Sequence, residues 1–316
     1  MIDFRYHLVS IAAIFLALAV GTVLGAGPLQ NSIGSTLQSE VTRLRAEKAD
    51  LRTQLDASTR GAQARDSFDA TTLPTVVAGH LKGTDVALVV LPDVDQAVVK
   101  QTASTLRAAG ATVTGTVQVS DAMVSTDAAA RTKVATPLVE TLGLSGASSS
   151  AADEDVAARV LAASLVTGGQ GAATPDDDAR ASALTALEKA GLISSDTPTP
   201  AAAPAAVLLG ATVSGDVAER TSLANAQVGV AEAVDRQANA ALLAGPTTTT
   251  SSSTQSVVSA ARKNADLIGK LTTVDDADIP LGQASIALGL QEQAAGGSGQ
   301  YGLATDAKSA YPQPEK

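Results

Sequence analysis

A long stretch dominated by apolar positions lies near the start of the chain. Residues 8–27 read LVSIAAIFLALAVGTVLGAG and contain no charged side chain. As an α-helix this run is about 30 Å long, which matches the hydrocarbon core of a bilayer. Because a helix satisfies its own backbone hydrogen bonds, we expect a membrane anchor over residues 8–29, preceded by a cytoplasmic head of residues 1–7.

A cleaved secretory signal peptide is the alternative interpretation of this run. The apolar stretch exceeds the roughly 7–15 residues of a signal-peptide core, and Pro28 would directly follow the small residues at which cleavage could occur. These features favour a retained anchor. A buried soluble helix is disfavoured because the run is apolar on all sides rather than along one stripe.

The charges that flank the anchor do not decide its orientation. Arg5 precedes it, and Arg43, Arg45 and Lys48 follow within about 20 residues, so the count of positive charges is ambiguous. Long domains cross a membrane largely regardless of their charge. We therefore expect a single-pass protein of the cell membrane, with its N-terminus inside and its C-terminal domain extracytoplasmic.

Behind the anchor, residues recur with the seven-residue spacing of a coiled coil. With the leucines assigned to position d, the a and d positions are Leu37, Val41, Leu44, Lys48, Leu51 and Leu55. A β-branched residue at a with leucine at d favours two parallel strands, and a single lysine at a fixes the register at a cost in stability. The pattern covers barely three heptads, so an amphipathic helix packed on its own domain remains an alternative.

Two further features favour a parallel homodimer. In the same frame Glu40 and Glu47 occupy position g, while Arg45 and Arg52 occupy position e. Contacts from g of one helix to e of its partner would then join opposite charges in both heptads. The anchor also contains a ladder of small residues that lets membrane helices approach closely, formed by Ala17, Gly21 and Gly25. We expect a coiled-coil stalk over residues 30–60.

Residues 73–303 alternate between short apolar runs and helical patterns. Residues 85–91 (DVALVVL) have the pattern of a buried strand, residues 95–109 that of a helix ending at Gly110, and residues 111–119 that of a second strand. This order predicts a βαβ unit with parallel strands. Further helices are expected near 127–142, 152–167, 176–190, 216–233, 255–263 and 281–296, and further strands near 205–209, 240–245 and 266–274.

This alternation predicts an α/β fold with a Rossmann-like, mainly parallel sheet that helices cover on both faces. The segments between these elements are polar or rich in small residues. Residues 61–72 are polar and break the heptad, residues 197–204 form a Pro/Ala linker, and residues 247–254 (TTTTSSST) have the composition of a flexible loop. After Gly296 the chain is rich in Gly, Pro and polar residues, and we expect a flexible tail over residues 304–316.

Composition narrows the function. Hydrophobic residues make up 45% of the 316 positions, but there are three Phe, three Tyr and no Trp, so Ala, Val and Leu must build the core. A net charge of −10 argues against nucleic acid as a partner, because phosphates require a basic surface. The chain has no cysteine, which excludes disulfides, thiolate nucleophiles and zinc–thiolate sites.

The turns after the predicted strands carry no phosphate-binding motif. Residues 92–95 (PDVD) contain no glycine and would repel a phosphate, and residues 210–215 (GATVSG) lack both the G-x-G-x-x-G spacing and a lysine. A histidine-based catalytic triad would have to use His80, the only histidine near the globular region. We expect no cofactor, no catalytic residue and no enzyme activity.

Residues that bind soft metals are few. The chain has two histidines, His7 and His80, and two methionines, Met1 and Met123, whereas a copper site requires a cluster of such ligands. Capping of helix N-termini and solvation explain the chain's acidic groups more simply than a hard cation does. These groups are Asp176, Asp177 and Asp178, and Asp275, Asp276 and Asp278.

Both ends of the chain resemble a known family. Residues 1–29, MIDFRYHLVSIAAIFLALAVGTVLGAGPL, resemble the opening of the actinobacterial copper-transporter (MctB-like) family of membrane proteins, and the resemblance continues through the predicted coiled coil. It returns at residues 273–302, TVDDADIPLGQASIALGLQEQAAGGSGQYG, which look like the family's C-terminal signature. The middle of the chain matches only in the layout of its elements.

The resemblance implies a cell-envelope protein of copper homeostasis or efflux, with copper as a transported ion and an outer envelope membrane as an alternative location. One membrane helix cannot enclose an aqueous pore, so a transport role would require an oligomer. The alternative is a non-catalytic dimeric envelope scaffold that recruits or regulates a cell-division or cell-wall partner and binds no copper.

Overall fold

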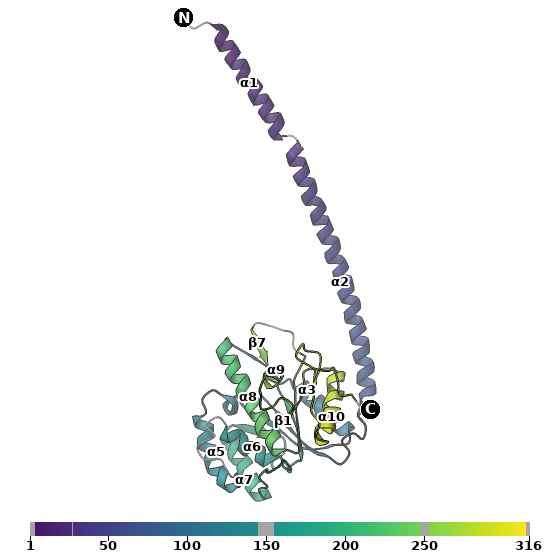
Figure 1. The fold of residues 1–316 in the computed structure, drawn as a ribbon, viewed down its shortest axis with the longest axis vertical. Helices are drawn as coiled ribbons and strands as arrows, with labels where there is room; N and C mark the ends of the chain where they lie inside the picture. The colour runs from purple at the N-terminus through teal and green to yellow at the C-terminus, as the bar shows by residue number, and fades with distance from the viewer. Residues whose placement is uncertain (1–3, 27, 145–154, 248–252, 314–316) are drawn as a thin grey trace. The chain divides into compact units, whose positions relative to one another are not determined.

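The structure is a computed structural model that describes residues 4–26, 28–144, 155–247 and 253–313. It divides into two units, Met1–Arg65 and Asp66–Lys316. Helix α1 (Phe4–Ala26) lies in the first unit, and helix α2 (Pro28–Val77) begins there and ends in the second (Figure 1).

Helix α1 is apolar on every side. Its segment Phe4–Gly25 has 22 residues, a mean hydropathy of 2.5 and no residue buried by the rest of the chain. The Thr22 hydroxyl donates to the carbonyl oxygen of Leu18 at 2.6 Å, which satisfies a polar group that lipid could not. The helix is long and apolar enough to cross a bilayer, and it begins four residues before the predicted run at Leu8.

Helix α2 is longer than the predicted stalk. It continues beyond residue 60, through the polar segment 61–72 and through Pro74, to Val77. Leu73 packs against the core of the second unit, and Val77 is fully buried in that core. The last turns of α2 therefore belong to the globular part of the chain.

A seven-stranded sheet forms the centre of the second unit. Its strand order is β3-β2-β1-β4-β6-β8-β9, and every pair is parallel except β2 with β3. These strands are β1 (Asp85–Val90), β2 (Thr112–Val119), β3 (Ile193–Ser195), β4 (Ala205–Leu209), β6 (Ala240–Ala244), β8 (Thr272–Val274) and β9 (Gln300–Tyr301). A separate antiparallel pair joins β5 (Thr212–Ser214) to β7 (Thr254–Ser256). The chain reverses its winding between β1 and β4, the topological switch point of an open α/β sheet.

Helices cover both faces of this sheet (Figure 1). One face packs against α3 (Gln96–Ala108) and α10 (Pro280–Ala294). The other packs against α4 (Asp121–Val124), α5 (Ala129–Thr141), α6 (Val156–Leu165), α7 (Asp177–Lys189), α8 (Val217–Gln237) and α9 (Val257–Ala261). Because both faces are covered, strands such as β4 and β6 are apolar and buried along their whole length. The predicted α/β class and mainly parallel sheet are confirmed.

Several predicted elements differ from the structure. The strand expected over residues 266–274 is restricted to β8, and hydrogen-bonded turns at residues 264–271 precede it. The antiparallel strand β3 was not predicted. Strand β9 lies after Gly296, where we predicted no strand. Three residues are too few to show a period, so short edge strands escape pattern-based prediction.

Two expected segments fall partly outside the described residues. Of the expected flexible loop 247–254, residues 248–252 are not described, and Thr254 begins β7. In the expected tail, 304–316, the described part makes definite contacts. The backbone N–H of Gly302 donates to the Ser309 carbonyl at 2.9 Å, and Asp306 forms an ion pair with Arg262.

Candidate functional site

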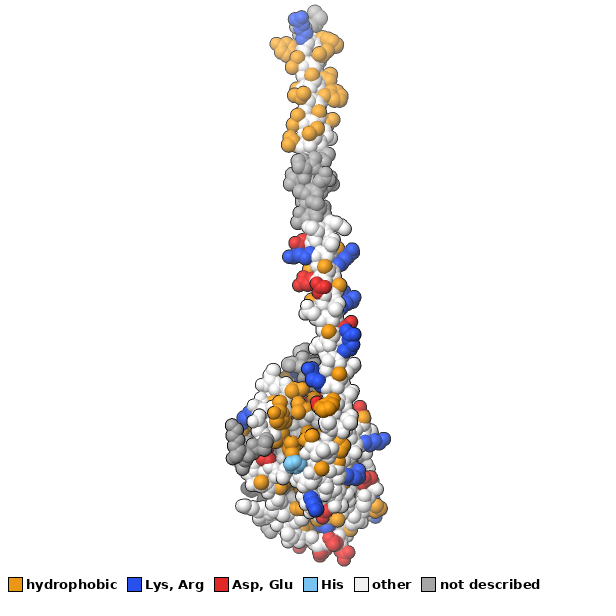
Figure 2. All heavy atoms as spheres, turned by 90° about the vertical axis from the view of Figure 1, so that its right-hand side faces the viewer, with side chains coloured by type: hydrophobic (Ala, Val, Ile, Leu, Met, Phe, Trp, Pro, Cys, Tyr) orange, Lys and Arg blue, Asp and Glu red, His pale blue; other side chains and the backbone are white. Residues whose placement is uncertain are grey.

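The predicted dimerisation residues lie on an exposed stripe of α2. Of the apolar members, Val41 is the least exposed at 39% and Leu55 the most exposed at 65%. Leu37, Leu44, Lys48 and Leu51 are exposed as well. Figure 2 shows single apolar side chains among charged ones along this helix. An apolar stripe of this kind is what a second helix covers in a coiled coil.

The charged residues beside this stripe are also exposed. Glu40 pairs with Arg43 of its own helix at 2.7 Å, whereas the dimer prediction pairs it with Arg45 of a second copy. Arg45, Glu47 and Arg52 point into solvent. In the anchor, a Cβ added at Gly21 or at Gly25 would meet no other atom within 4 Å, so this ladder, with the exposed Ala17, is open to a partner.

Within the second unit, the soft-metal ligands His80 and Met123 are not brought together. His80 Nδ1 lies 2.7 Å from Gln291 Oε1 of α10, on the face of the sheet that α3 and α10 cover. Met123 is buried in the core of the opposite face. His7 lies in α1, and Met1 is outside the described residues. Within the described ranges, no group of three or more His, Cys, Asp or Glu side chains is arranged to hold a metal ion.

The acidic group at residues 176–178 caps a helix. Asp176 Oδ1 accepts a hydrogen bond from the backbone N–H of Ala179 at 2.8 Å, and Asp177 forms an ion pair with Arg180 at 2.6 Å. Both contacts stabilise the N-terminus of α7, where the helix dipole favours negative charge.

The acidic group at residues 275–278 has a different role, because it ties the C-terminal segment to the sheet. The buried Asp275 carboxylate accepts from Arg262 at 2.6 Å and from the backbone N–H groups of Leu303 and Ala304 at 2.8 and 3.0 Å. Arg262 also donates to Asp306 and to the Tyr301 carbonyl oxygen, both at 2.7 Å. All these partners lie within the chain.

Asp276 is fully buried, and neither of its side-chain oxygens has a hydrogen-bond partner. Burial, reinforced by the charges of Asp275 and Asp278, raises the pKa of Asp276 to about 7. Asp278 has partners, since it accepts from the backbone N–H and the hydroxyl of Thr247 at 2.5 and 2.9 Å. The carboxyl of Asp276 therefore keeps its proton to a higher pH than an exposed aspartate does.

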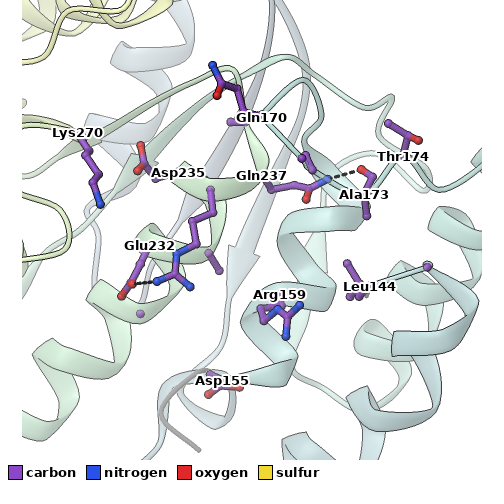
Figure 3. A pocket seen from close by; sticks show the side chains of 18 residues that line it. Leu144, Asp155, Arg159, Gln170, Ala173, Thr174, Glu232, Asp235, Gln237 and Lys270 are labelled. Carbon is purple, nitrogen blue, oxygen red and sulfur yellow. Dashed lines mark hydrogen bonds and ion pairs between the residues drawn. The ribbon is translucent and has the colours of Figure 1, made fainter. Parts of the chain in front are cut away.

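The second unit contains a polar cleft of about 960 Å³. Five described segments line it: residues 143–144 after α5, the start of α6, the loop 169–174, the end of α8 and the turn before β8. Figure 3 shows the charged side chains that line it. These are Asp155 and Arg159 from α6 and its N-cap, Glu232, Asp235 and Arg236 from α8, and Lys270 from the turn.

The floor of the cleft is held in place by backbone contacts. Gln237 Nε2 donates to the carbonyl oxygens of Ala173 at 2.6 Å and Val166 at 3.3 Å, which fixes the loop against α8. A Cβ at Gly169 would lie 2.5 Å from the Arg236 carbonyl oxygen, so only glycine permits this approach. The cleft is thus preformed.

Two carboxyls on α8 have raised pKa values. Burial is the main cause for both, and it raises the pKa of Asp235 to about 6, an effect that Lys270 partly offsets and Glu232 reinforces. Glu232 is paired with Arg236. Among its described neighbours Asp235 has no hydrogen-bond partner, so its carboxylate is available to a bound molecule.

Comparison with known proteins assigns the chain to a family. Residues 1–312 match the family described as copper transport outer membrane protein, MctB. The chain belongs to this family. A copper transporter MctB of Mycobacterium leprae is 31% identical to it, and one of Mycobacterium tuberculosis is 29% identical, with 98% of each chain covered in both cases. The resemblance of both ends is confirmed, and together with α1 the match supports a membrane-anchored, copper-related envelope protein.

Proposed function

We propose that this chain is the membrane-anchored subunit of an assembly that moves copper out of the cell or across its envelope. The observation that carries the proposal is the family match over residues 1–312. The relatives that align with nearly the whole chain are also named copper transporters. The comparisons give no support to a copper-independent scaffold.

The architecture favours an assembly over a channel made by one chain. The described residues contain one helix that could span a membrane, and one helix cannot enclose a pore. They also contain no group of three or more His, Cys, Asp or Glu side chains that could hold a metal ion. Copper would then pass along a path that several subunits or a partner protein complete, and this chain would act without catalysis.

Within that assembly, two copies would join through the exposed stripe of α2 as a parallel coiled coil. The g-to-e′ charge pairs and the small-residue ladder of α1 support this arrangement.

The N-terminus would lie inside the cell, and the Rossmann-like domain outside it. Because the chain has no cysteine, Ala57→Cys provides a single thiol on α2. A membrane-impermeant maleimide should label this thiol in intact cells. Labelling only after lysis would show that the C-terminal domain lies inside the cell, opposite to the proposed orientation.

The copper role is tested in cells of the source organism that lack the protein. Under copper load, we expect their copper content, measured by mass spectrometry of washed cells, to exceed that of wild-type cells several-fold. The full chain should restore the normal value, and a version with α1 replaced by a cleavable export signal should not. Equal copper content with and without the protein would contradict the proposal.

A further inference from the structure

Three buried oxygen atoms at the junction of β8 and α10 have no hydrogen-bond partner among the described residues. They are the two carboxylate oxygens of Asp276, close to the end of β8, and Oε1 of Gln283, in the first turn of α10. Both side chains are fully buried, with 0% of their surface exposed. Buried polar atoms are nearly always satisfied by the protein, by ordered water or by an ion, so these three oxygens indicate a bound species.

The two side chains belong to one place in the fold. A Cβ at Gly282, the residue before Gln283, would lie 2.7 Å from Asp276 Oδ1. The amide nitrogen of Gln283 donates to the carbonyl oxygen of Ala277, the residue after Asp276, at 2.5 Å and to the Thr102 hydroxyl at 3.0 Å. These bonds occupy the donor side of the amide and leave its oxygen as a free acceptor.

The charges around Asp276 leave its carboxylate uncompensated. The charged groups that act on it are Asp275, Asp278 and Arg262. Arg262 is already shared, because it pairs with Asp275 at 2.6 Å and with Asp306 at 2.7 Å. A buried carboxylate without a partner is costly unless it binds a proton or a cation.

The type of ligand and the charge of the site select the cation. Carboxylate and amide oxygens are hard ligands, which suit a hard cation and not Cu(I). A monovalent ion balances the one uncompensated carboxylate, whereas a divalent ion would add an unpaired positive charge to a buried site. The close approach of Gly282 to Asp276 leaves little space, which favours sodium over the larger potassium ion.

We propose that Asp276 and Gln283 bind a sodium ion at the junction of β8 and α10, with their three unpartnered oxygens as ligands. The ion would hold the strand and the helix together at the residues where they meet. Because burial raises the pKa of Asp276 to about 7, a proton and a sodium ion compete for this carboxylate near neutral pH. The site uses no copper, so its test is separate from that of the transport role.

The first test measures the melting temperature of the full chain in a non-ionic detergent at pH 8, with sodium chloride replacing tetramethylammonium chloride at constant ionic strength. We expect the melting temperature to rise by at least about 3 °C when sodium reaches about 200 mM, because an ion that binds only the folded state stabilises it. Potassium chloride should give a smaller rise. At pH 5 the proton occupies Asp276, so sodium should have no effect.

Sodium-23 NMR of the folded chain provides a second readout that does not depend on unfolding. The wild-type chain should broaden the sodium line more at pH 8 than at pH 5. Asp276→Asn keeps the shape of the side chain and removes its charge, so it should abolish both the temperature rise and the pH-dependent broadening. Gln283→Met removes the amide oxygen and should weaken both, which provides a second variant if the first does not fold.

The matched control is Asp178→Asn, an exposed change on α7 that removes the same charge from the chain. It should respond to sodium as wild type does. Three results would overturn the proposal: equal melting temperatures in sodium and tetramethylammonium at pH 8, an equal rise with potassium, or a sodium response retained in Asp276→Asn.

Discussion

At the scale of single residues, the junction of β8 and α10 combines buried charge with very close packing. Arg262 and Asp275 form a buried ion pair with further hydrogen bonds, whereas Asp276 is buried with none. Buried ion pairs are costly to break because one charge is then left unpaired. Residues 273–302, one of the two stretches whose resemblance indicated the family, thus include Asp275, which joins β8 to the segment after β9.

Replacing Asp276 should change how stability depends on pH. Its pKa is about 7 in the folded chain against 3.8 for the unfolded one, so only the unfolded chain loses a proton between those values. The folded state therefore loses stability as pH rises from about 4 to 7, by about 4 kcal/mol in total. Asp276→Asn should lack this loss.

Thermal unfolding of the full chain in detergent at pH 5 and pH 8 measures the difference. The melting temperature of Asp276→Asn, relative to wild type, should be higher at pH 8 than at pH 5. The exposed Asp178→Asn serves as the control and should follow wild type at both values. A constant offset between Asp276→Asn and wild type would mean that Asp276 does not titrate in this range.

Two helical glycines should respond in opposite ways to alanine. A Cβ at Gly282 of α10 would overlap the Asp276 carbonyl oxygen, so Gly282→Ala forces the strand and helix apart. A Cβ at Gly229 of α8 meets no atom within 4 Å, so Gly229→Ala gains helix propensity. We expect a loss of about 2 kcal/mol or more in the first case and a gain of about 0.5–1 kcal/mol in the second. Melting temperatures that move in the same direction would contradict this packing.

At the scale of elements, long buried strands could be predicted from the sequence and short edge strands could not. The predicted strand 205–209 has the same bounds as β4, and the predicted strand 85–91 contains β1. Both could be predicted because strands covered on both faces are continuously apolar. Strands β3 and β9 have three and two residues, and their pairing depends on neighbours distant in sequence. Helix α8 ends four residues after the predicted Ala233, and these residues include Asp235 and Arg236 of the cleft.

The α2 stripe makes a direct prediction about pairing. If two copies form a parallel coiled coil, residues at position d face their equivalents, whereas those at position f point away. In the cysteine-free chain, Leu44→Cys should therefore form a disulfide-linked dimer under mild oxidation, and Ala46→Cys at position f should not. Non-reducing electrophoresis of membranes separates the two. Equal cross-linking of both variants would exclude this register.

At the scale of the whole molecule, the two ends of the chain identified the family, but the cleft was not predicted. Arg159, Asp235 and Lys270 come from two helices and a turn, with no shared motif or spacing, and only the fold brings them together. The scarcity of soft-metal ligands was visible in the sequence, which has two histidines, two methionines and no cysteine. The structure adds that His80 and Met123 lie on opposite faces of the sheet.

The most direct test of the account is a Cu(I) titration of the purified full chain in detergent, under reductant, with calorimetry and with light scattering to give the mass. Our account assigns copper handling to an assembly, so it predicts a dimer that shows no stoichiometric binding tighter than about micromolar. Tight one-to-one binding that is lost in His80→Gln would contradict it and would locate a copper site within this chain.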